Sequence, residues 1–337
     1  MKYFLTIFIV SALFSVSCTK NNSFVRSLYL WKVSQNISEK DTSFFNKNKI
    51  DKLYIRFFDV SKEKNEFTPK GILNFTGICP EKQEIIPVIF IENKSLENAD
   101  FEQIKELATN MRTKMKSLSA QYFPNKIIKE LQLDCDWSNK TKDNFFRLIQ
   151  VTEEENPDKV ISVTIRLHQI KYSEKTGVPP ADKGVLMYYN MGNFKNPEEL
   201  NSILNNTTGE QYLKNIEEYP LDLSLALPVF SWSVLFKENE AKGIIYSLNS
   251  NTIESNDFLE KTKNNLYKVI KDTVYEDYYL RKGDILRFEN SEISEIKKAE
   301  NLCKKLTKNE IIIFSYSPEN SKIIKDDKID EIFSIKY

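Results

Sequence analysis

Several residue types that common catalytic sites require are scarce in this chain of 337 residues. His168 is its one histidine, which excludes metal sites built from several histidines and makes any Ser-His-Asp apparatus depend on that residue. Only eight glycines are present, and neither GxGxxG nor GxxxxGK occurs, so glycine-rich loops that bind nucleotide phosphates are missing. The 48 basic and 48 acidic residues cancel, which disfavours a nucleic-acid-binding surface. We expect no metal, no cofactor and no nucleic-acid partner.

Cysteine is also scarce. Cys79, Cys135 and Cys303 are widely spaced, which excludes a CxxC redox motif and a zinc ribbon. Each has an apolar sequence context, so we predict buried free thiols. A disulfide between two of the three stays open, because the beginning of the chain points to an oxidising compartment.

Residues 1–17 have the features of a signal peptide, with Lys2 followed by the apolar run Tyr3 to Phe14 and then small residues up to Cys18. This run is too short to span a bilayer. The residues before Cys18 resemble a bacterial lipobox, although Ser15 stands where leucine is usual. We predict cleavage before Cys18, lipidation of that cysteine, a tether over 18–25 and an extracytoplasmic protein anchored to a bacterial membrane, with the outer membrane expected. An ordinary signal peptide and an uncleaved anchor are the alternatives.

Beyond residue 25, apolar runs alternate with polar stretches of helical periodicity, which is the pattern of a parallel sheet covered by helices. Eight runs over about 300 residues predict an α/β protein with a (β/α)8 barrel, or TIM barrel, spanning 26–337. A doubly wound sheet is disfavoured because its glycine-rich turn is missing. The runs are Ser27–Val33, Lys52–Val60, Glu84–Ile91, Glu130–Trp137, Val160–Ile170, Gly184–Met191, Leu223–Phe236 and Ile311–Ser317.

Helical periodicity is clearest over 95–119, 141–152 and 291–306, and Asn196 followed by Pro197 predicts a further helix start. The stretch 237–290 is too long for a single crossover. It holds strand-like runs and a helical pattern over 256–271, so we predict a small α+β insertion between strands seven and eight.

Polar side chains share one face of the fourth predicted strand. Because alternate residues of a barrel strand face the interior, Asp134 and Asp136 are expected together near the C-terminal strand ends, where barrel active sites lie. Arg56 and Arg166 have the same inward parity on the second and fifth strands. We interpret these residues as a catalytic or substrate-binding acid pair held by arginines. The alternative is a buried ion-pair network without chemistry.

His168 shares the parity of Arg166, so it is either a proton shuttle or substrate contact, or a hydrogen-bonded residue at the barrel rim. Trp31, Trp137 and Trp232 offer rings on which sugars could stack. For Trp137 the apolar parity favours core packing.

Three strand motifs together resemble glycoside hydrolase family 18, the chitinases and endo-N-acetylglucosaminidases. The family's fourth strand carries D-x-x-D-x-D-x-E, and residues 131–138 read L-Q-L-D-C-D-W-S. Its sixth strand often reads M-x-Y-D or M-x-Y-N, as Met187-Tyr188-Tyr189-Asn190 does here, and 225–231 resemble its seventh strand. The resemblance implies a barrel that binds glycans, with Asp136 and Tyr189 at the positions that steady a substrate acetamido group and Asn190 beside them.

Two positions depart from the family pattern. Ser138 stands where the family has its general acid Glu, and Leu131 replaces the first Asp. A serine hydroxyl cannot protonate a glycosidic oxygen as a carboxylic acid does. We therefore expect a barrel lipoprotein that binds glycan, with N-acetyl sugars favoured, and Ser138 makes hydrolysis doubtful. Two alternatives stay open: a hydrolase whose acid is Asp134, Asp136, Glu92 or Asp59, and a structural or assembly lipoprotein.

Overall fold

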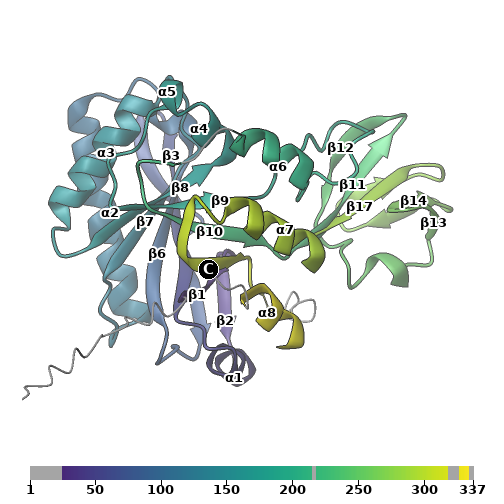
Figure 1. Cartoon of the computed structure of the whole chain (residues 1–337), viewed down its shortest axis with the longest axis horizontal. Coiled ribbons are helices and arrows are strands. Elements are labelled where there is room, and N and C mark those ends of the chain that lie inside the picture. Colours follow the sequence, from purple (N-terminus) through teal and green to yellow (C-terminus); the bar gives the residue numbers. More distant parts are fainter. Residues whose placement is uncertain (1–24, 215–217, 318–325, 334–337) are drawn as a thin grey trace, which may run out of the picture.

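The computed structural model describes residues 25–214, 218–317 and 326–333. Its main body is a closed barrel of eight parallel strands, in the order β1-β3-β6-β7-β8-β9-β10-β18, with β18 pairing back to β1 (Figure 1). The predicted (β/α)8 fold is therefore confirmed. The barrel strands are β1 (Val25–Leu30), β3 (Lys52–Glu63), β6 (Glu84–Ile91), β7 (Glu130–Asp134), β8 (Val160–Arg166), β9 (Lys183–Met187), β10 (Leu223–Pro228) and β18 (Thr307–Phe314).

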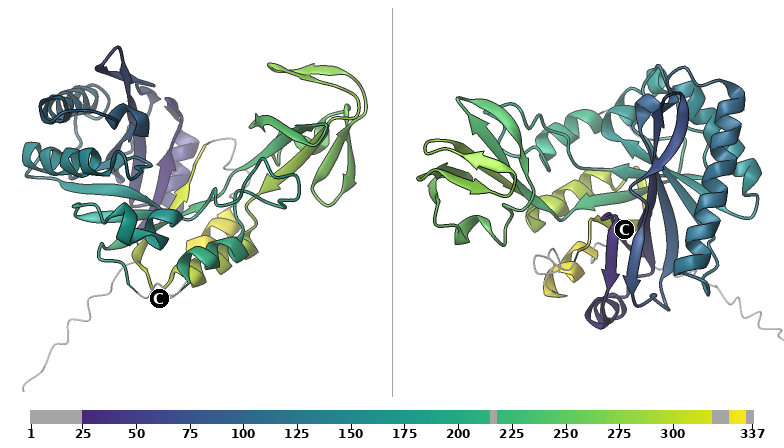
Figure 2. Two further views of the ribbon diagram at one scale, coloured as in Figure 1. Left: turned by 90° about the horizontal axis from the view of Figure 1, so that it is seen from above. Right: turned by 180° about the vertical axis from the view of Figure 1, so that it is seen from behind.

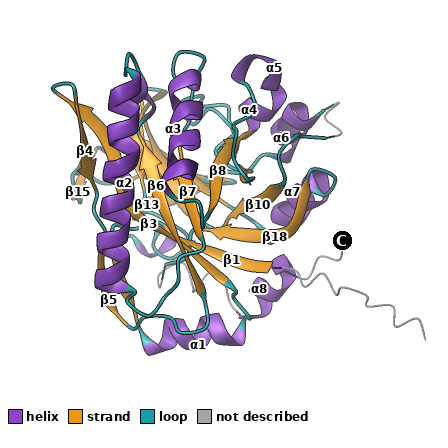
Figure 3. Cartoon of the chain, turned by 90° about the vertical axis from the view of Figure 1, so that its left-hand side faces the viewer, coloured by secondary structure: helices purple, strands orange, loops and turns teal. Residues whose placement is uncertain are grey.

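Helices cover the outside of the barrel (Figure 3). The longest, α2 (Phe101–Tyr122), begins at Asp100, whose side chain accepts a hydrogen bond from the Gln103 backbone in a capping box. It buries one apolar stripe at helical spacing against the strands. The other helices are α1 (Glu39–Lys47), α3 (Lys142–Glu155), α4 (Leu167–Lys171), α5 (Ser173–Thr176), α6 (Asn206–Leu213), α7 (Ile293–Cys303) and α8 (Asp326–Phe333).

A second, five-stranded sheet projects from the barrel, and its strands lie in the chain between β10 and β18 (Figure 2). It has its own apolar core around Leu235, Tyr267 and Leu286. The boundaries predicted for an insertion, 237 and 290, stay a prediction. The remaining strands are β11 (Ser231–Lys237), β12 (Glu240–Ile245), β13 (Leu259–Lys263), β14 (Leu266–Val269) and β17 (Ile285–Asn290) in this sheet, and β2 (Ser34–Ile37), β4 (Glu66–Lys70), β5 (Asn74–Gly77), β15 (Thr273–Tyr275) and β16 (Tyr278–Leu280) elsewhere.

The seventh predicted strand, 223–236, is wrong as a single strand, because it is divided between the two sheets. Strand β10 ends at Pro228 in the barrel, and β11 begins at Ser231 in the second sheet. Both strands are buried almost throughout, so the apolar run continues across the boundary and cannot mark it.

Two predicted helices are also wrong. Residues 256–271 contain the antiparallel strands β13 and β14, joined by a turn in which Asn264 has a φ of 43°. The Asn196-Pro197 segment forms a turn, in which the Asn196 side chain accepts a hydrogen bond from the Glu198 backbone. The Asn196 carbonyl accepts a hydrogen bond from the Arg287 guanidinium. The next helix along the chain, α6, begins only at Asn206.

The barrel interior is polar at the N-terminal ends of the strands and aromatic in its middle. At the N-terminal strand ends, Glu130 and Glu310 form ion pairs with Lys52 and Lys183. Above them, Tyr29 packs among apolar residues of five other strands. This filled interior supports the residues at the C-terminal strand ends from below.

Cys79, Cys135 and Cys303 are all free thiols, and burial raises the pKa of each. Cys135 and Cys303 are fully buried, as predicted, whereas Cys79 is partly exposed. Residues 1–17 and Cys18, on which the signal-peptide and lipidation predictions depend, lie outside the described residues. Among the described helices, none is both long enough and apolar enough to cross a membrane.

Candidate functional site

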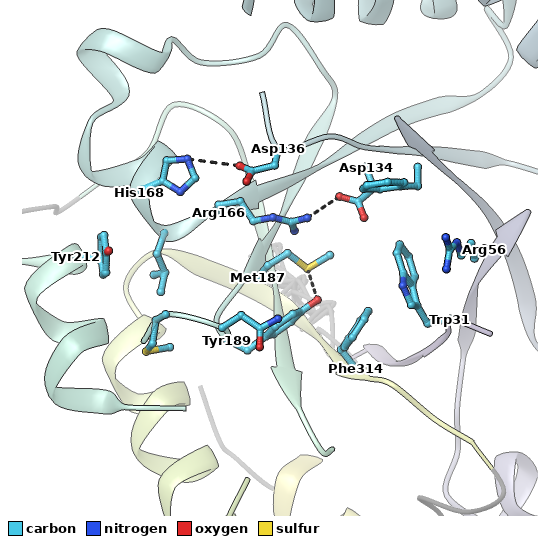
Figure 4. Close-up of a pocket in the computed structure, with 14 residues that line it drawn as sticks. Trp31, Arg56, Asp134, Asp136, Arg166, His168, Met187, Tyr189, Tyr212 and Phe314 are labelled. Atoms are coloured by element: carbon cyan, nitrogen blue, oxygen red, sulfur yellow. Dashed lines mark hydrogen bonds and ion pairs between the residues drawn. The ribbon is translucent and has the colours of Figure 1, made fainter. Parts of the chain in front are cut away.

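A cavity of about 460 Å³ opens at the C-terminal ends of the barrel strands (Figure 4). Strands β6, β7, β8, β9 and β18 each contribute a side chain from their last two residues or from the residues just after them, and Arg56 comes from the middle of β3. This end of a barrel carries the site in (β/α)8 enzymes, because the loops that follow the strands can vary without disturbing the core. Seven of the predicted site residues line the cavity, namely Arg56, Asp134, Asp136, Arg166, His168, Tyr189 and Asn190.

Asp134 and Arg166 form an ion pair in the wall of the cavity, with 2.9 Å between Oδ1 and Nη2. The Asp134 side chain is 3 % exposed, whereas that of Arg166 is 25 % exposed and reaches the cavity. Burial is the largest single effect on the pKa of Arg166 and lowers it, but the surrounding groups, Asp134 foremost and then Tyr189 and Asp136, together outweigh burial, so the net shift is upward. Asp134 also accepts a hydrogen bond from Thr164 at 2.5 Å. Its Oδ1 is therefore fully engaged as an acceptor.

Asp136 lies beyond the end of β7 and is 57 % exposed. Its Oδ1 lies 3.5 Å from His168 Nε2 and 3.5 Å from Gln169 Nε2. The two aspartates are thus in different environments, because one is buried in the barrel wall and the other lies in a loop at the rim.

His168 is not on a strand, which corrects its predicted placement. Strand β8 ends at Arg166, and His168 lies in the first turn of α4 with a partly exposed side chain. The Gln169 side chain accepts a hydrogen bond from the Arg166 backbone, which ends the strand at that point. The predicted position of His168 at the barrel rim is nevertheless where the structure has it.

Three aromatic rings form a continuous floor to the cavity. Tyr189 stacks on Phe314, with ring centroids 4.8 Å apart and an angle of 23° between the rings. Phe314 in turn packs against Trp31, with ring centroids 5.4 Å apart. The Tyr189 hydroxyl donates a hydrogen bond to Met187 Sδ at 3.3 Å, and burial raises its pKa. A floor of this kind can stack against the apolar face of a sugar ring.

Arg56 lies at the opposite side of the cavity and is held by two partners. Its guanidinium donates two hydrogen bonds to the Asp59 carboxylate and lies 5.1 Å from the Trp31 ring centroid. Asp59 itself does not line the cavity. Arg56 therefore acts as a fixed support for Trp31, with its charge already matched by Asp59.

Ser138, which stands where the family has its acid, lies in the turn that leads into α3. Its backbone N–H donates to the Thr141 hydroxyl at 3.0 Å, and its carbonyl accepts from the backbone of Lys142 in the first turn of α3. Ser138 is not among the lining residues, and neither is the exposed Glu92. The carboxylates that line this cavity are those of Asp134 and Asp136.

Trp232 does not line the cavity, unlike the other predicted ligand-binding residues. It is 7 % exposed, its Nε1 donates to Glu289 Oε2 at 3.0 Å, and its ring packs against Phe230. Trp137 is also buried, at 1 %, as its apolar parity predicts, and it donates to the Thr176 carbonyl.

Sequence reasoning missed several lining residues, notably Phe314, Met187 and Tyr212. Phe314 and Met187 are the final residues of β18 and β9, so the rule that located Asp134 could have found them. They carry no charge, and an uncharged residue at a strand end gives no separate signal. Tyr212 lies on α6, which the sequence pattern did not predict.

The described residues contain no group of three or more His, Cys, Asp or Glu side chains suited to bind a metal ion. Asn190 has a left-handed backbone with φ of 53°, and its backbone N–H donates to the Ile203 carbonyl. Backbone strain of this kind is tolerated where neighbouring structure enforces it, and it is frequent at binding sites.

No protein-family model matches the chain, and no curated protein matches it in sequence. Its fold is nevertheless similar to those of a solved spore cortex-lytic enzyme and of solved chitinases. The spore cortex-lytic enzyme SleL of Bacillus cereus is similar with a TM-score of 0.53 and 14 % identity, covering 93 % of this chain and 75 % of that one. A chitinase from Chromobacterium violaceum has a TM-score of 0.53 and 8 % identity over 94 % of this chain and 100 % of that one.

The catalytic domain of chitinase B from Arthrobacter is similar to the same degree, with a TM-score of 0.53 and 9 % identity over 93 % of this chain and 96 % of that one. At these identities the comparison establishes a shared fold. The barrel implied by the resemblance to glycoside hydrolase family 18 is thus confirmed.

Proposed function

We propose that this protein binds a glycan at the C-terminal mouth of its barrel and does not cleave it. One observation carries the proposal. The cavity combines an aromatic floor of Trp31, Phe314 and Tyr189 with polar groups from Arg166 and Asp136, which is the mixture of stacking and hydrogen bonding that sugar rings require. The fold shared with chitinases and SleL supports a glycan as the ligand. A scaffold without a ligand would need no such cavity.

The environment of each carboxylate supports binding without turnover. Glycosidic cleavage needs a carboxylic acid that holds a proton until it is transferred to the leaving oxygen. Asp134 accepts hydrogen bonds from Arg166 and Thr164, and the side chain of Asp136, beside His168, is more than half exposed. Ser138 lies outside the cavity. The mouth therefore offers acceptors for sugar hydroxyls and no enclosed proton donor.

Calorimetry with the tetramer of β-1,4-linked N-acetylglucosamine tests the proposal. We expect wild type to bind the tetramer and mass spectrometry to find it intact after prolonged incubation. Tyr189→Ala, which removes part of the floor, should weaken binding about tenfold, or about 1.4 kcal/mol. Ser138→Ala is the matched control and should bind as wild type does. Absence of binding to this tetramer and to β-1,4-linked glucose and peptidoglycan fragments would overturn the proposal.

An active hydrolase is the second candidate, and the presence of both Asp134 and Asp136 in the cavity favours it. In that case shorter products would accumulate from the tetramer. Their formation would be abolished in Asp136→Asn while binding was retained. That result would replace the binding proposal with an enzymatic one.

We further propose that the protein acts outside the cytoplasm, anchored to a bacterial membrane, with the outer membrane expected, through lipid on Cys18. The apolar run Tyr3 to Phe14 and the small residues before Cys18 support this. Labelled palmitate should be incorporated into wild type and not into Cys18→Ser, and wild type should fractionate with the outer membrane. Unlabelled wild type in the soluble fraction would overturn the proposal.

A further inference from the structure

The barrel has two ends, and the cavity lies at the end next to α4 (Figure 1). At the opposite end, the segments that lead into the strands form a continuous surface, which we call the N-terminal rim. Backbone hydrogen bonds join neighbouring segments of this rim, from Asp51 to Arg26, from Glu84 to Asp51 and from Val160 to Lys129. The described chain begins on the rim, at Val25 of β1. The rim is therefore the part of the barrel that follows Cys18 most closely along the chain.

Ile127 on the N-terminal rim is, at 80 %, the most exposed large apolar side chain among the described residues. Structure on both sides fixes its position. Before it, Lys126 Nζ donates hydrogen bonds to the carbonyls of Glu81 and Gln83 at 2.6 Å and 2.9 Å. After it, Ile128 packs in the main apolar core. The side chain of Ile127 is thus held outward at a defined place.

Two further apolar side chains are exposed on the same rim. Val160, the first residue of β8, and Ile78, in the loop that leads to β6, are each 40 % exposed. A single exposed apolar residue is ordinary on a protein surface, but these three share one end of the barrel. Charged residues of both signs lie among them, with Lys82, Lys129 and Glu81 exposed. The apolar side chains, and not the net charge, therefore distinguish this surface.

The length of chain before β1 indicates what this surface meets. Six residues, 19–24, separate Cys18 from Val25. Since an extended chain spans at most about 3.6 Å per residue, Val25 stays within about 25 Å of a lipidated Cys18. So short a tether makes contact between the rim and the bilayer intramolecular, with a high effective concentration, so weak apolar contacts suffice. Apolar side chains can enter the boundary between headgroups and acyl chains, while lysines beside them reach the headgroups.

We propose that the N-terminal rim, with Ile78, Ile127 and Val160, docks on the surface of the bilayer that holds the Cys18 lipid. This inference rests on the lipid anchor of the proposed function and is independent of glycan binding. Docking fixes the orientation of the barrel, which would otherwise turn freely on its tether. The cavity, at the other end, then opens away from the membrane.

Quenching of tryptophan fluorescence by brominated lipid tests the docking. The lipidated protein is reconstituted in vesicles of phosphatidylethanolamine and phosphatidylglycerol whose acyl chains carry bromine. In Ile127→Trp, the fluorescence of the added indole should fall by about half or more, because tryptophan at the membrane interface lies close to the acyl chains. Wild type should be almost unquenched, since Trp31 lines the cavity and Trp137 and Trp232 are buried.

Leu200→Trp is the matched control. Leu200 is 70 % exposed in the segment between β9 and α6, which leaves the barrel at the cavity end, so its indole should keep its fluorescence. Val160→Trp puts a second indole on the rim and is the variant to use if Ile127→Trp does not fold. Adding Ile127→Asp to Val160→Trp should reduce the quenching, because a charge is costly to bury at the position that isoleucine occupied.

The possible failures can be told apart. If the protein carries no lipid on Cys18 and does not stay on the vesicles, the anchor and this inference are both overturned. If the lipidated protein stays on the vesicles, but folded Ile127→Trp and Val160→Trp are quenched no more than Leu200→Trp, docking is overturned and the anchor stands. If Ile127→Asp leaves the quenching of Val160→Trp unchanged, the rim does not dock as one surface and the inference is likewise overturned.

Discussion

Arg287 and Glu289 form an ion pair that is almost completely buried, with 2.7 Å between Nε and Oε1 and side-chain exposures of 1 % and 0 %. Arg287 also donates to the Asn196 carbonyl at 2.6 Å, and Glu289 accepts from the Ser202 hydroxyl and from Trp232 Nε1. The pair therefore fastens the second sheet to the chain segment that follows Asn190 at the mouth of the cavity.

Breaking this pair should destabilise the protein strongly. Arg287→Met leaves the Glu289 carboxylate buried without a cation, so we expect a loss of about 3–5 kcal/mol in the free energy of unfolding. Urea unfolding measures the loss. The double variant Arg287→Met/Glu289→Gln should lose less, because no unpaired charge remains. Lys242→Met, whose partner Glu240 lies on the surface, is the control and should leave the urea midpoint almost unchanged.

Gly209 in α6 should resist replacement by alanine. A Cβ atom at this position would lie 2.0 Å from the Tyr188 hydroxyl, and Tyr188 is fully buried with a hydrogen bond to Asn206. Alanine in place of helical glycine normally stabilises a helix by about 0.5–1 kcal/mol. Here we expect a loss of about 1–3 kcal/mol in thermal unfolding, because either α6 or Tyr188 must move. A stabilised Gly209→Ala variant would contradict this contact.

The barrel and the inward-facing charged residues of the cavity can be predicted from the sequence because both depend on periodicity. Along β7, Leu131 and Leu133 pack outward in the main apolar core, while Gln132 and Asp134 face the interior. A two-residue period is visible in the sequence without any knowledge of neighbouring strands. The rule that sites lie at C-terminal strand ends then selects Asp134 from this inward face.

The errors arise where long-range contacts decide the structure. Strand β14 pairs with β17, about 20 residues further along the chain, and that pairing overrides the helical spacing of its apolar residues. The Asn196 carbonyl accepts a hydrogen bond from Arg287, which again lies on a strand distant in the sequence. Trp232 was expected at a sugar because it is large and aromatic, but its Nε1 is satisfied by Glu289 inside the second sheet. None of these partners is evident in the local sequence.

Glu300 on α7 should make the protein less stable at alkaline pH. Its side chain is 1 % exposed, its oxygens have no hydrogen-bond partner among the described residues, and burial raises its pKa to about 8 from an ordinary value of 4.5. As the pH rises from about 4.5 to about 8, the unfolded chain releases this proton first, so the free energy of unfolding falls.

Glu300→Gln carries no such proton and should remove this dependence. Its free energy of unfolding relative to wild type should rise between about pH 5 and pH 8 and then level off. Urea titrations across that range measure the difference. A constant difference between the two proteins at every pH would contradict the prediction.

Glu310, at the opposite end of the barrel from the cavity, should give the reverse dependence on pH. Burial alone would raise its pKa, but the charges of Lys183 and Lys52 and hydrogen bonds from Ser27 and Ser224 lower it below the ordinary 4.5. The folded state therefore keeps the carboxylate ionised at a pH where the unfolded chain is already protonated. Its contribution to stability is present above about pH 4.5 and is lost as the pH falls through the lowered value.

Glu310→Gln should therefore be less stable than wild type at neutral pH, because two partly buried lysines lose a counter-charge. The deficit should shrink as the solution is acidified, since wild type then loses the same carboxylate by protonation. Urea unfolding of both proteins at neutral pH and near pH 3 measures the change. A deficit of equal size at both pH values would show that Glu310 stabilises the barrel through packing, and that its ion pairs with Lys52 and Lys183 contribute nothing.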